Sequence, residues 1–117
     1  MCSEDDGFHG RFPEWSNQLP TAEGGRYVAH EHGTLSVGLF APRGADDQGP
    51  HRRDEVYVVV RGEGWFVCGQ SRRRFGPGDL LFVPAGVEHR FEEFTDDLSA
   101  WVLFYGPDGG EPARPKP

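Results

Sequence analysis

Two histidines and one glutamate in this chain have the side chains and the spacing to hold a divalent metal ion. They are His51, Glu55 and His89. Two imidazoles and one carboxylate suit Fe(II), Mn(II), Ni(II), Co(II) or Zn(II), and they leave coordination positions for water and substrate. Such an open site can polarise a carbonyl, activate water or, with iron, bind dioxygen. Taken singly, each residue is an ordinary surface or core side chain, so a metal site requires that all three meet.

The spacing restricts how these side chains can meet. His51 and Glu55 are four residues apart, and four steps along a straight strand span ~13 Å, too far for two ligands of one ion. A helix is disfavoured because a proline precedes His51 and a valine-rich run follows Glu55. We therefore expect a turn at residues 52–54, with His51 ending one strand and Glu55 opening the next. His89 follows a turn at 84–86 by three residues and comes from a different hairpin.

The elements that must position these residues have the pattern of short strands. The chain contains 17 Gly and 10 Pro, which interrupt brief apolar runs. This pattern is typical of an all-β domain with tight turns, either a sandwich or a barrel. The strongest strand signal is at 56–60, where four of five residues are β-branched. The expected strands cover residues 27–28, 35–40, 56–60, 65–68, 72–75, 80–83, 88–94 and 98–105.

Length and charge narrow the class of protein further. A chain of 117 residues corresponds to one domain. Its net charge of −7 argues against nucleic acid or an anionic membrane surface as the main partner. No apolar run approaches the ~20 residues of a membrane span, and the acidic start lacks the apolar segment of a secretory signal. We expect a cytoplasmic protein in which Cys2 and Cys68 are reduced thiols.

At this point the residues resemble the cupin superfamily. The later half of its first motif matches His51, Glu55 and Gly62, with three and then six intervening residues. The second motif matches over a longer stretch, at Gly78, Pro84, Gly86 and His89. The resemblance implies a double-stranded β-helix, the jelly-roll cupin barrel, which we place at 26–106, with an N-terminal arm at 1–25 and a flexible tail at 107–117. It also implies that the motif residues His51, Glu55 and His89 bind the metal.

The chain departs from the cupin pattern at two positions. Gly49 stands where the first motif has its first histidine, and Glu93 stands where the second motif ends in asparagine. The metal then keeps only the two histidines and the carboxylate, or another side chain replaces the missing ligand, or the affinity for metal is low. The candidates for replacement are the Gln48 amide oxygen and either His30 or His32, which share one face of a straight strand.

Several residues are placed around the site by strand alternation. Tyr57 shares the face of Glu55, and Phe91 shares the face of His89. Tyr57 and Glu93 are the candidate catalytic bases, and the arginines at 52–53 are positioned to bind a substrate carboxylate or phosphate. Further aromatic candidates for the pocket wall, which serve equally well as core, are Trp65, Phe82, Trp101 and Phe104.

Three functional hypotheses follow from these residues. The first is a metal-dependent enzyme, oxygenase-like or isomerase-like, that acts on a small polar or aromatic molecule. The second is a non-catalytic cupin module that binds or senses a small ligand. The third is a structural interaction domain with a vestigial metal site.

In each case a homodimer is expected, because the runs at 56–60, 80–83 and 101–105 are apolar on both faces and only one face fills the barrel.

Overall fold

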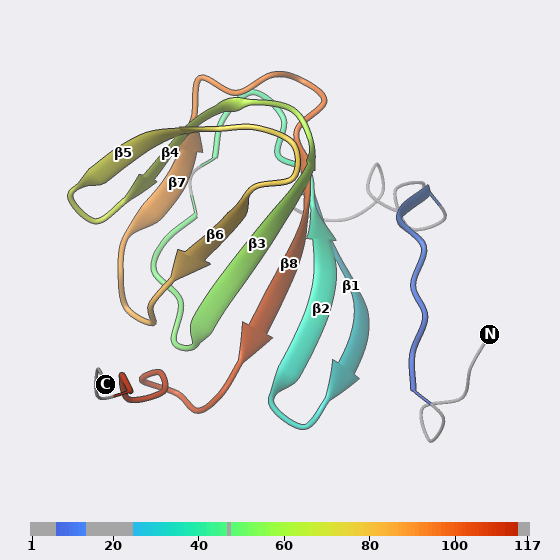
Figure 1. The fold of residues 1–117 in the computed structure, drawn as a ribbon, viewed down its shortest axis with the longest axis vertical. Coiled ribbons are helices and arrows are strands. Elements are labelled where there is room, and N and C mark those ends of the chain that lie inside the picture. The colour runs from blue at the N-terminus through green and yellow to red at the C-terminus, as the bar shows by residue number, and fades with distance from the viewer. Residues whose placement is uncertain (1–6, 14–24, 47, 115–117) are drawn as a thin grey trace.

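The structure is a computed structural model, which describes residues 7–13, 25–46 and 48–114. Eight antiparallel strands form two sheets, ordered β1-β2-β8-β3-β6 and β5-β4-β7 (Figure 1). The all-β prediction is confirmed. In chain order the strands are β1 Arg26–His32, β2 Leu35–Phe40, β3 Asp54–Arg61, β4 Gly64–Cys68, β5 Ser71–Phe75, β6 Leu80–Val83, β7 His89–Glu92 and β8 Ser99–Tyr105.

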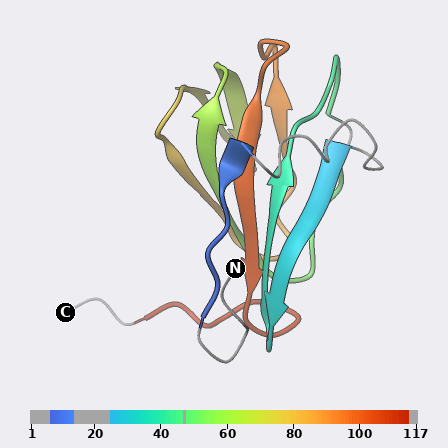
Figure 2. The same ribbon diagram turned by 90° about the vertical axis from the view of Figure 1, so that its right-hand side faces the viewer.

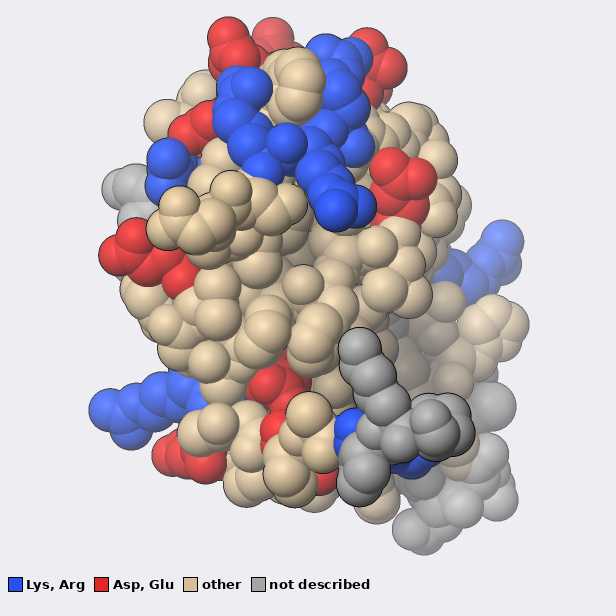
Figure 3. Space-filling model, turned by 60° about the vertical axis from the view of Figure 1, so that its left-hand side comes forward, with Lys and Arg blue, Asp and Glu red and all other residues tan. Residues whose placement is uncertain are grey.

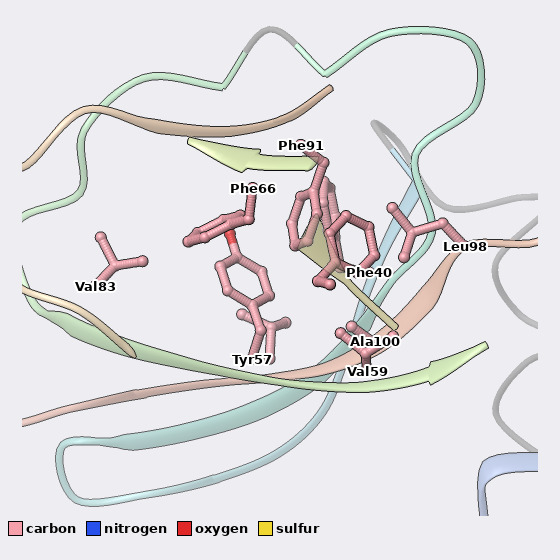
Figure 4. Close-up of a cluster of buried hydrophobic side chains, with 10 residues drawn as sticks. Phe40, Tyr57, Val59, Phe66, Val83, Phe91, Leu98 and Ala100 are labelled. Carbon is pink, nitrogen blue, oxygen red and sulfur yellow. The ribbon is translucent and has the colours of Figure 1, made fainter. Parts of the chain in front are cut away.

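The two sheets face each other across one hydrophobic core. Aromatic rings dominate it: the Tyr57 ring meets the Phe91 ring edge-on at 5.0 Å, and the Phe66 ring lies 4.9 Å from that of Phe91. Figure 4 shows Tyr57 reaching from β3 toward Phe66 on the opposite sheet. The buried members of this cluster are Phe40, Tyr57, Val59, Phe66, Phe75, Val83, Phe91, Leu98, Ala100 and Val102.

Strand β3 has the alternation that a sheet with one buried face requires. Glu55, Tyr57 and Val59 point into the core and are buried, whereas the valines at 56, 58 and 60 lie half-buried on the other face. The buried face therefore carries a carboxylate and a phenol among apolar side chains. These two polar groups lie side by side at the start of β3, where both can take part in one site.

Part of the outer face of the larger sheet is covered by the N-terminal segment. Phe12 packs with Trp101 against Leu39 and Ala41, both of them buried. Figure 2 shows this segment running along the sheet beside β8. The Arg61 guanidinium stacks on the Phe12 ring at 4.9 Å. Trp15 and Leu19, also predicted to belong to the N-terminal arm, lie outside the described residues.

Strand β1 contains a β-bulge that changes which side chains face inward. Val28 is paired with Gly38, but the next pair joins His30 to Val37, so one residue is extra. Before the bulge Arg26 lies opposite Phe40, on the core face. After it, His30 and His32 turn to the outer face, and the His30 ring stacks on Phe8 at 4.3 Å.

The connections near the site are held by hydrogen bonds. The predicted turn between His51 and Glu55 is present as a bend at 52–53, although His51 precedes β3 in a loop and does not end a strand. The start of the predicted tail is attached, because Gly109 N donates to the Arg52 carbonyl and Glu111 N donates to the Asp54 carboxylate. The described part of the chain contains no helix with the length and hydrophobicity needed to cross a bilayer.

Candidate metal centre

The three predicted ligands come together between the two sheets. Glu55 is the second residue of β3 in one sheet, and His89 is the first residue of β7 in the other. His51 approaches from the loop before β3, and its carbonyl accepts a hydrogen bond from Gly86 N in the turn before β7. This backbone contact joins the two motif segments, so the loop that carries His51 is attached to the hairpin that carries His89.

The ligand atoms lie within reach of one ion. One nitrogen from each histidine and one oxygen from Glu55 all lie within 4.8 Å of each other. Glu55 Oε1 is 3.0 Å from His89 Nε2 and 3.8 Å from His51 Nε2. On its other side, His89 Nδ1 donates to the Val87 carbonyl at 3.0 Å, which leaves Nε2 as the coordinating nitrogen.

The buried polar atoms of this cluster fit a cation. Both carboxylate oxygens of Glu55 and the Nε2 atom of His89 are fully buried, and none of them has a hydrogen-bond partner with acceptable geometry. Leaving such atoms unsatisfied costs roughly 1–3 kcal/mol each, and more for a charged group. A divalent ion bound between them would satisfy all three atoms at once, so the residues present suit a metal.

Gln48 occupies the place beside the triad where a fourth ligand is missing. Its Oε1 atom lies 3.1 Å from His51 Nε2 and accepts hydrogen bonds from the Tyr57 hydroxyl at 3.0 Å and the Arg26 guanidinium at 2.7 Å. Its amide nitrogen donates to Asp46 Oδ2 at 2.7 Å. Of the three candidates named from the sequence, Gln48 is thus the one at the site, whereas the bulge in β1 turns both histidines to the outer face.

Tyr57 contributes a buried hydroxyl to the same cluster. Its side chain is fully buried, and its ring centroid lies 6.2 Å from that of His89. Burial, together with the negative charge of Glu55, raises the pKa of Tyr57 well above its ordinary value of 10. The hydroxyl therefore keeps its proton and acts as a hydrogen-bond donor at neutral pH.

The two histidines differ in their electrostatic environment. Burial lowers the pKa of His51 below 6.5, and the nearby Glu55 carboxylate offsets only part of this effect. Burial also disfavours a charged His89, but Glu55 and the Val87 carbonyl outweigh it, and the pKa of His89 is raised. His51 is thus the more readily available neutral ligand, whereas the Glu55 carboxylate favours the protonated form of His89 when no metal is bound.

A cavity of about 560 Å³ opens beside His51 and Gln48. Its wall includes Arg26 and Arg43, and the Arg26 guanidinium stacks on the Phe40 ring at 5.2 Å. Sequence reasoning missed both arginines. Neither belongs to a motif, and only the pairing of β1 with β2 opposite Phe40 brings Arg26 to this wall.

Some predicted site residues lie elsewhere. Glu93 follows β7 with a φ of 48°, its side chain is 74% exposed, and its carboxylate is 2.8 Å from Arg72 Nη2, so the structure does not bring it to the metal centre. Figure 3 shows a group of basic side chains, with acidic side chains around it, at one end of the molecule. Arg53 donates to the Thr34 carbonyl and lies over the Phe104 ring, and it does not line the cavity beside His51. This position differs from the prediction that Arg53 binds a substrate carboxylate or phosphate.

The predicted pocket aromatics separate into two groups. Phe104 lies edge-on to the His51 ring at 5.0 Å and lines the site, and Phe91 packs behind Tyr57. Trp65, Phe82 and Trp101 lie on outer faces, since their cross-strand partners are outward-facing residues. Cys68 is paired with His89 across β4 and β7, and burial raises the pKa of its thiol, which therefore stays protonated.

Comparison with known proteins identifies the family. The sequence model of the cupin domain matches residues 36–105, more than half of the chain. This chain belongs to the cupin family. The matched segment contains both motif regions and all three candidate metal ligands. The expectation drawn from the motifs, a small cupin with a jelly-roll fold, is confirmed.

Two relatives of this cupin are enzymes of different kinds, and a third is uncharacterized. It is 40% identical over 76 residues to an uncharacterized protein of Streptomyces coelicolor, a match that spans 63% of this chain and 72% of the relative. It is 37% identical over 57 residues to a dimethylsulfoniopropionate lyase of Ruegeria pomeroyi, covering 48% of this chain and 28% of the lyase. It is 45% identical over 47 residues to an acireductone dioxygenase of Coprinopsis cinerea, covering 35% and 26%.

The last two matches cover little of the named enzymes, since this chain spans less than a third of either one. Among solved structures, a cupin 2 conserved barrel protein from Rhodopseudomonas palustris superposes with a TM-score of 0.61 at 18% identity, over 71% of this chain and 61% of that one. This likeness supports the fold of this cupin.

Proposed function

We propose that this cupin is a metal-dependent enzyme that acts on a small polar molecule by proton transfer, as a lyase or an isomerase. The observation that carries the proposal is the placement of a buried, protonated phenol beside the metal cluster. Tyr57 and His51 both contact the Gln48 amide oxygen, at the edge of a cavity large enough for a small substrate. The match to a lyase of 37% identity supports the same class of reaction.

The residues divide the chemistry between them. His51, Glu55 and His89 would hold the metal, which when bound polarises a carbonyl or carboxyl oxygen of the substrate. Tyr57 holds a proton at its hydroxyl oxygen and can donate it to a substrate atom that takes the place of Gln48 Oε1. Phe104 lies against the His51 ring and Phe40 lies against the Arg26 guanidinium, so apolar rings adjoin the polar groups of the site.

Replacing Tyr57 by phenylalanine tests the proposal. Tyr57→Phe keeps the ring that packs on Phe91 and removes only the hydroxyl. We expect the variant to bind metal as the wild type does, while turnover of any substrate found by screening falls by about 10²-fold or more. Metal content is measured by plasma emission spectrometry on the same samples. Undiminished turnover in Tyr57→Phe would exclude the phenol as the proton-transfer group.

Oxygen-dependent oxidation is the second candidate function. Two histidines and one carboxylate are the ligand set of non-haem iron oxygenases, and the match to a dioxygenase at 45% identity favours this chemistry. Iron-loaded protein is then expected to consume oxygen with a substrate, and Tyr57→Phe would retain that consumption. If the purified protein binds no transition metal and His89→Ala leaves ligand binding intact, a non-catalytic binding module is the correct description.

A further inference from the structure

We propose that the substrate carries a carboxylate, and that Arg26 binds it at the position that the Gln48 amide oxygen now occupies. This inference rests on the proposed function, because it names the class of substrate for the same site. The cavity is then expected to bind an anionic ligand, with Arg26 as a binding residue.

Two hydrogen-bond donors converge on one neutral oxygen. Gln48 Oε1 accepts from Arg26 Nη2 at 2.7 Å and from the Tyr57 hydroxyl at 3.0 Å, and His51 Nε2 lies 3.1 Å away. A carbonyl oxygen has two lone pairs, so these two donors use its full capacity, and the charged guanidinium faces an acceptor without charge. A carboxylate has two oxygens and a negative charge, and it pairs with a guanidinium more strongly than an amide does. The donors are therefore better matched to a carboxylate than to the side chain that holds them now.

The guanidinium of Arg26 is fixed in orientation before any ligand arrives. It stacks on Phe40 with its central carbon 5.2 Å from the ring centroid, and Phe40 is itself buried in the core. A guanidinium held over a buried ring loses little freedom when it binds a carboxylate, so the site is pre-organised for an anion. The bulge in β1 contributes, since Arg26 lies on the core face whereas His30 and His32, after the bulge, lie on the outer face.

The charge and size of the cavity fit the same class of ligand. Its wall carries two arginines, Arg26 and Arg43, against one aspartate, Asp46, although the whole chain has a net charge of −7. Asp46 is already engaged by Gln48 and by Phe91 N. A volume of about 560 Å³ exceeds the space that a carboxylate alone requires, so the ligand would be a small organic acid with an apolar or polar body.

Gln48 can leave its position without disturbing a strand. It lies in the loop between β2 and β3 and borders the cavity, and its side-chain hydrogen bonds are made to other side chains and not to strand backbone. In the absence of a ligand its amide oxygen accepts from Arg26 and Tyr57, and a carboxylate that enters the cavity would displace it. The Gln48 side chain is thus a placeholder for the carboxylate of the substrate.

Matched acids and amides test the inference. Propionate and benzoate, each paired with propionamide or benzamide, are titrated into the full-length protein, and binding is followed by ligand-observed NMR. We expect each acid to bind at least about tenfold more tightly than its amide. Arg26→Gln should abolish this preference, whereas Arg74→Gln, which changes an exposed arginine that pairs with Glu63, should leave it unchanged. Gln48→Ala should strengthen binding of the acids several-fold.

Two outcomes would overturn the inference: equal affinities for acid and amide, or weaker acid binding in Gln48→Ala, which would make Gln48 a direct contributor. Arg26→Lys, which keeps the charge, guards against loss of fold in Arg26→Gln and should retain part of the preference. Metal content is measured on every sample. If the wild type takes up no metal but prefers acids through Arg26, the proposed metalloenzyme is refuted and the carboxylate site is supported. If the protein is metal-loaded and active but shows no such preference, the carboxylate site is refuted and the proposed metalloenzyme is supported.

Discussion

At the scale of single residues, the site depends on one buried carboxylate. Glu55 is fully buried, and its two oxygens have no hydrogen-bond partner although His89 Nε2 is 3.0 Å away. A close contact with poor hydrogen-bond geometry is what two ligands of one ion should have, because both point toward the metal rather than toward each other. The arrangement is therefore more favourable with a cation than without it.

Removing the metal should destabilise the wild type more than a variant that lacks the charge of Glu55. We expect a chelator to lower the melting temperature of the wild type. The loss in the free energy of unfolding should be about 3 kcal/mol if the metal was present at roughly 100 times its dissociation constant. Glu55→Gln keeps the shape of the side chain but binds metal weakly, so a chelator should leave its melting temperature unchanged. Calorimetry of both proteins with and without chelator measures the difference, and equal shifts would show that the metal stabilises another place.

Gly49 offers a second test at this scale, because it stands at the vacant motif position. A Cβ atom added there meets no heavy atom within 4 Å, so a larger side chain has room. We expect Gly49→His to supply the missing fourth ligand and to raise the affinity for Zn(II) by at least about tenfold. Gly49→Ala is the matched control and should bind as the wild type does. Competition with a chromophoric chelator gives both constants, and an unchanged affinity in Gly49→His would mean that residue 49 does not face the metal.

The cluster of the three candidate ligands could be predicted from the sequence, and so could Gln48 beside it, because spacing within two short motifs carries that information. Arg26 could not be found in the same way. Its role depends on which residue of β2 lies opposite it and on a bulge that local sequence does not specify. The proposal of Glu93 as a base followed from its motif position alone. Its positive φ and its ion pair with Arg72 turn it to solvent.

At the scale of elements, the position of β1 controls the cavity wall. The strand approaches β2 closely at Gly38, where an added Cβ would lie 2.4 Å from the Tyr27 carbonyl oxygen. Only a glycine allows this approach, and the bulge begins at the neighbouring pair of residues. Arg26 lies two residues before the bulge, so the geometry of the proposed carboxylate site depends on a glycine in another strand.

Gly38→Ala should therefore displace β1. We expect a loss of about 1–3 kcal/mol in the free energy of unfolding, since the clash is with backbone and cannot be relieved by a side-chain rotation. Gly76→Ala is the control, because an added Cβ there contacts nothing within 4 Å. Urea denaturation of the two variants provides the comparison. Equal stabilities would show that β1 can shift at no cost and does not hold Arg26 in place.

At the scale of the whole molecule, the fold could be predicted because short strands with regular turns indicate a sandwich or a barrel, and the resemblance to the two cupin motifs selects the cupin barrel. What covers the outer face of the larger sheet could not. The N-terminal segment covers the part formed by β2 and β8. Among the described residues, the part formed by β6 is exposed: Leu80 is 64% exposed and Phe82 is 48% exposed, opposite Val58 and Val56 of β3. Burying such a patch of adjacent apolar side chains stabilises association by roughly 25 cal/mol for each Å² removed from water.

A second copy of this chain is the expected partner for the exposed patch of Leu80 and Phe82. The patch lies on β6 at the edge of the larger sheet, where two copies can pack against each other about a two-fold axis. We expect the purified protein to have twice the 13.0 kDa mass of one chain in light scattering after gel filtration. Phe82→Asp should give a monomer, since it places a charge at the centre of the patch. Val28→Lys alters a valine that is 59% exposed at the opposite edge of the sheet, and it should leave the dimer intact. A monomeric wild type would mean that the apolar side chains of β6 remain exposed to solvent in the stable protein. The homodimer predicted from the apolar strands would then be wrong.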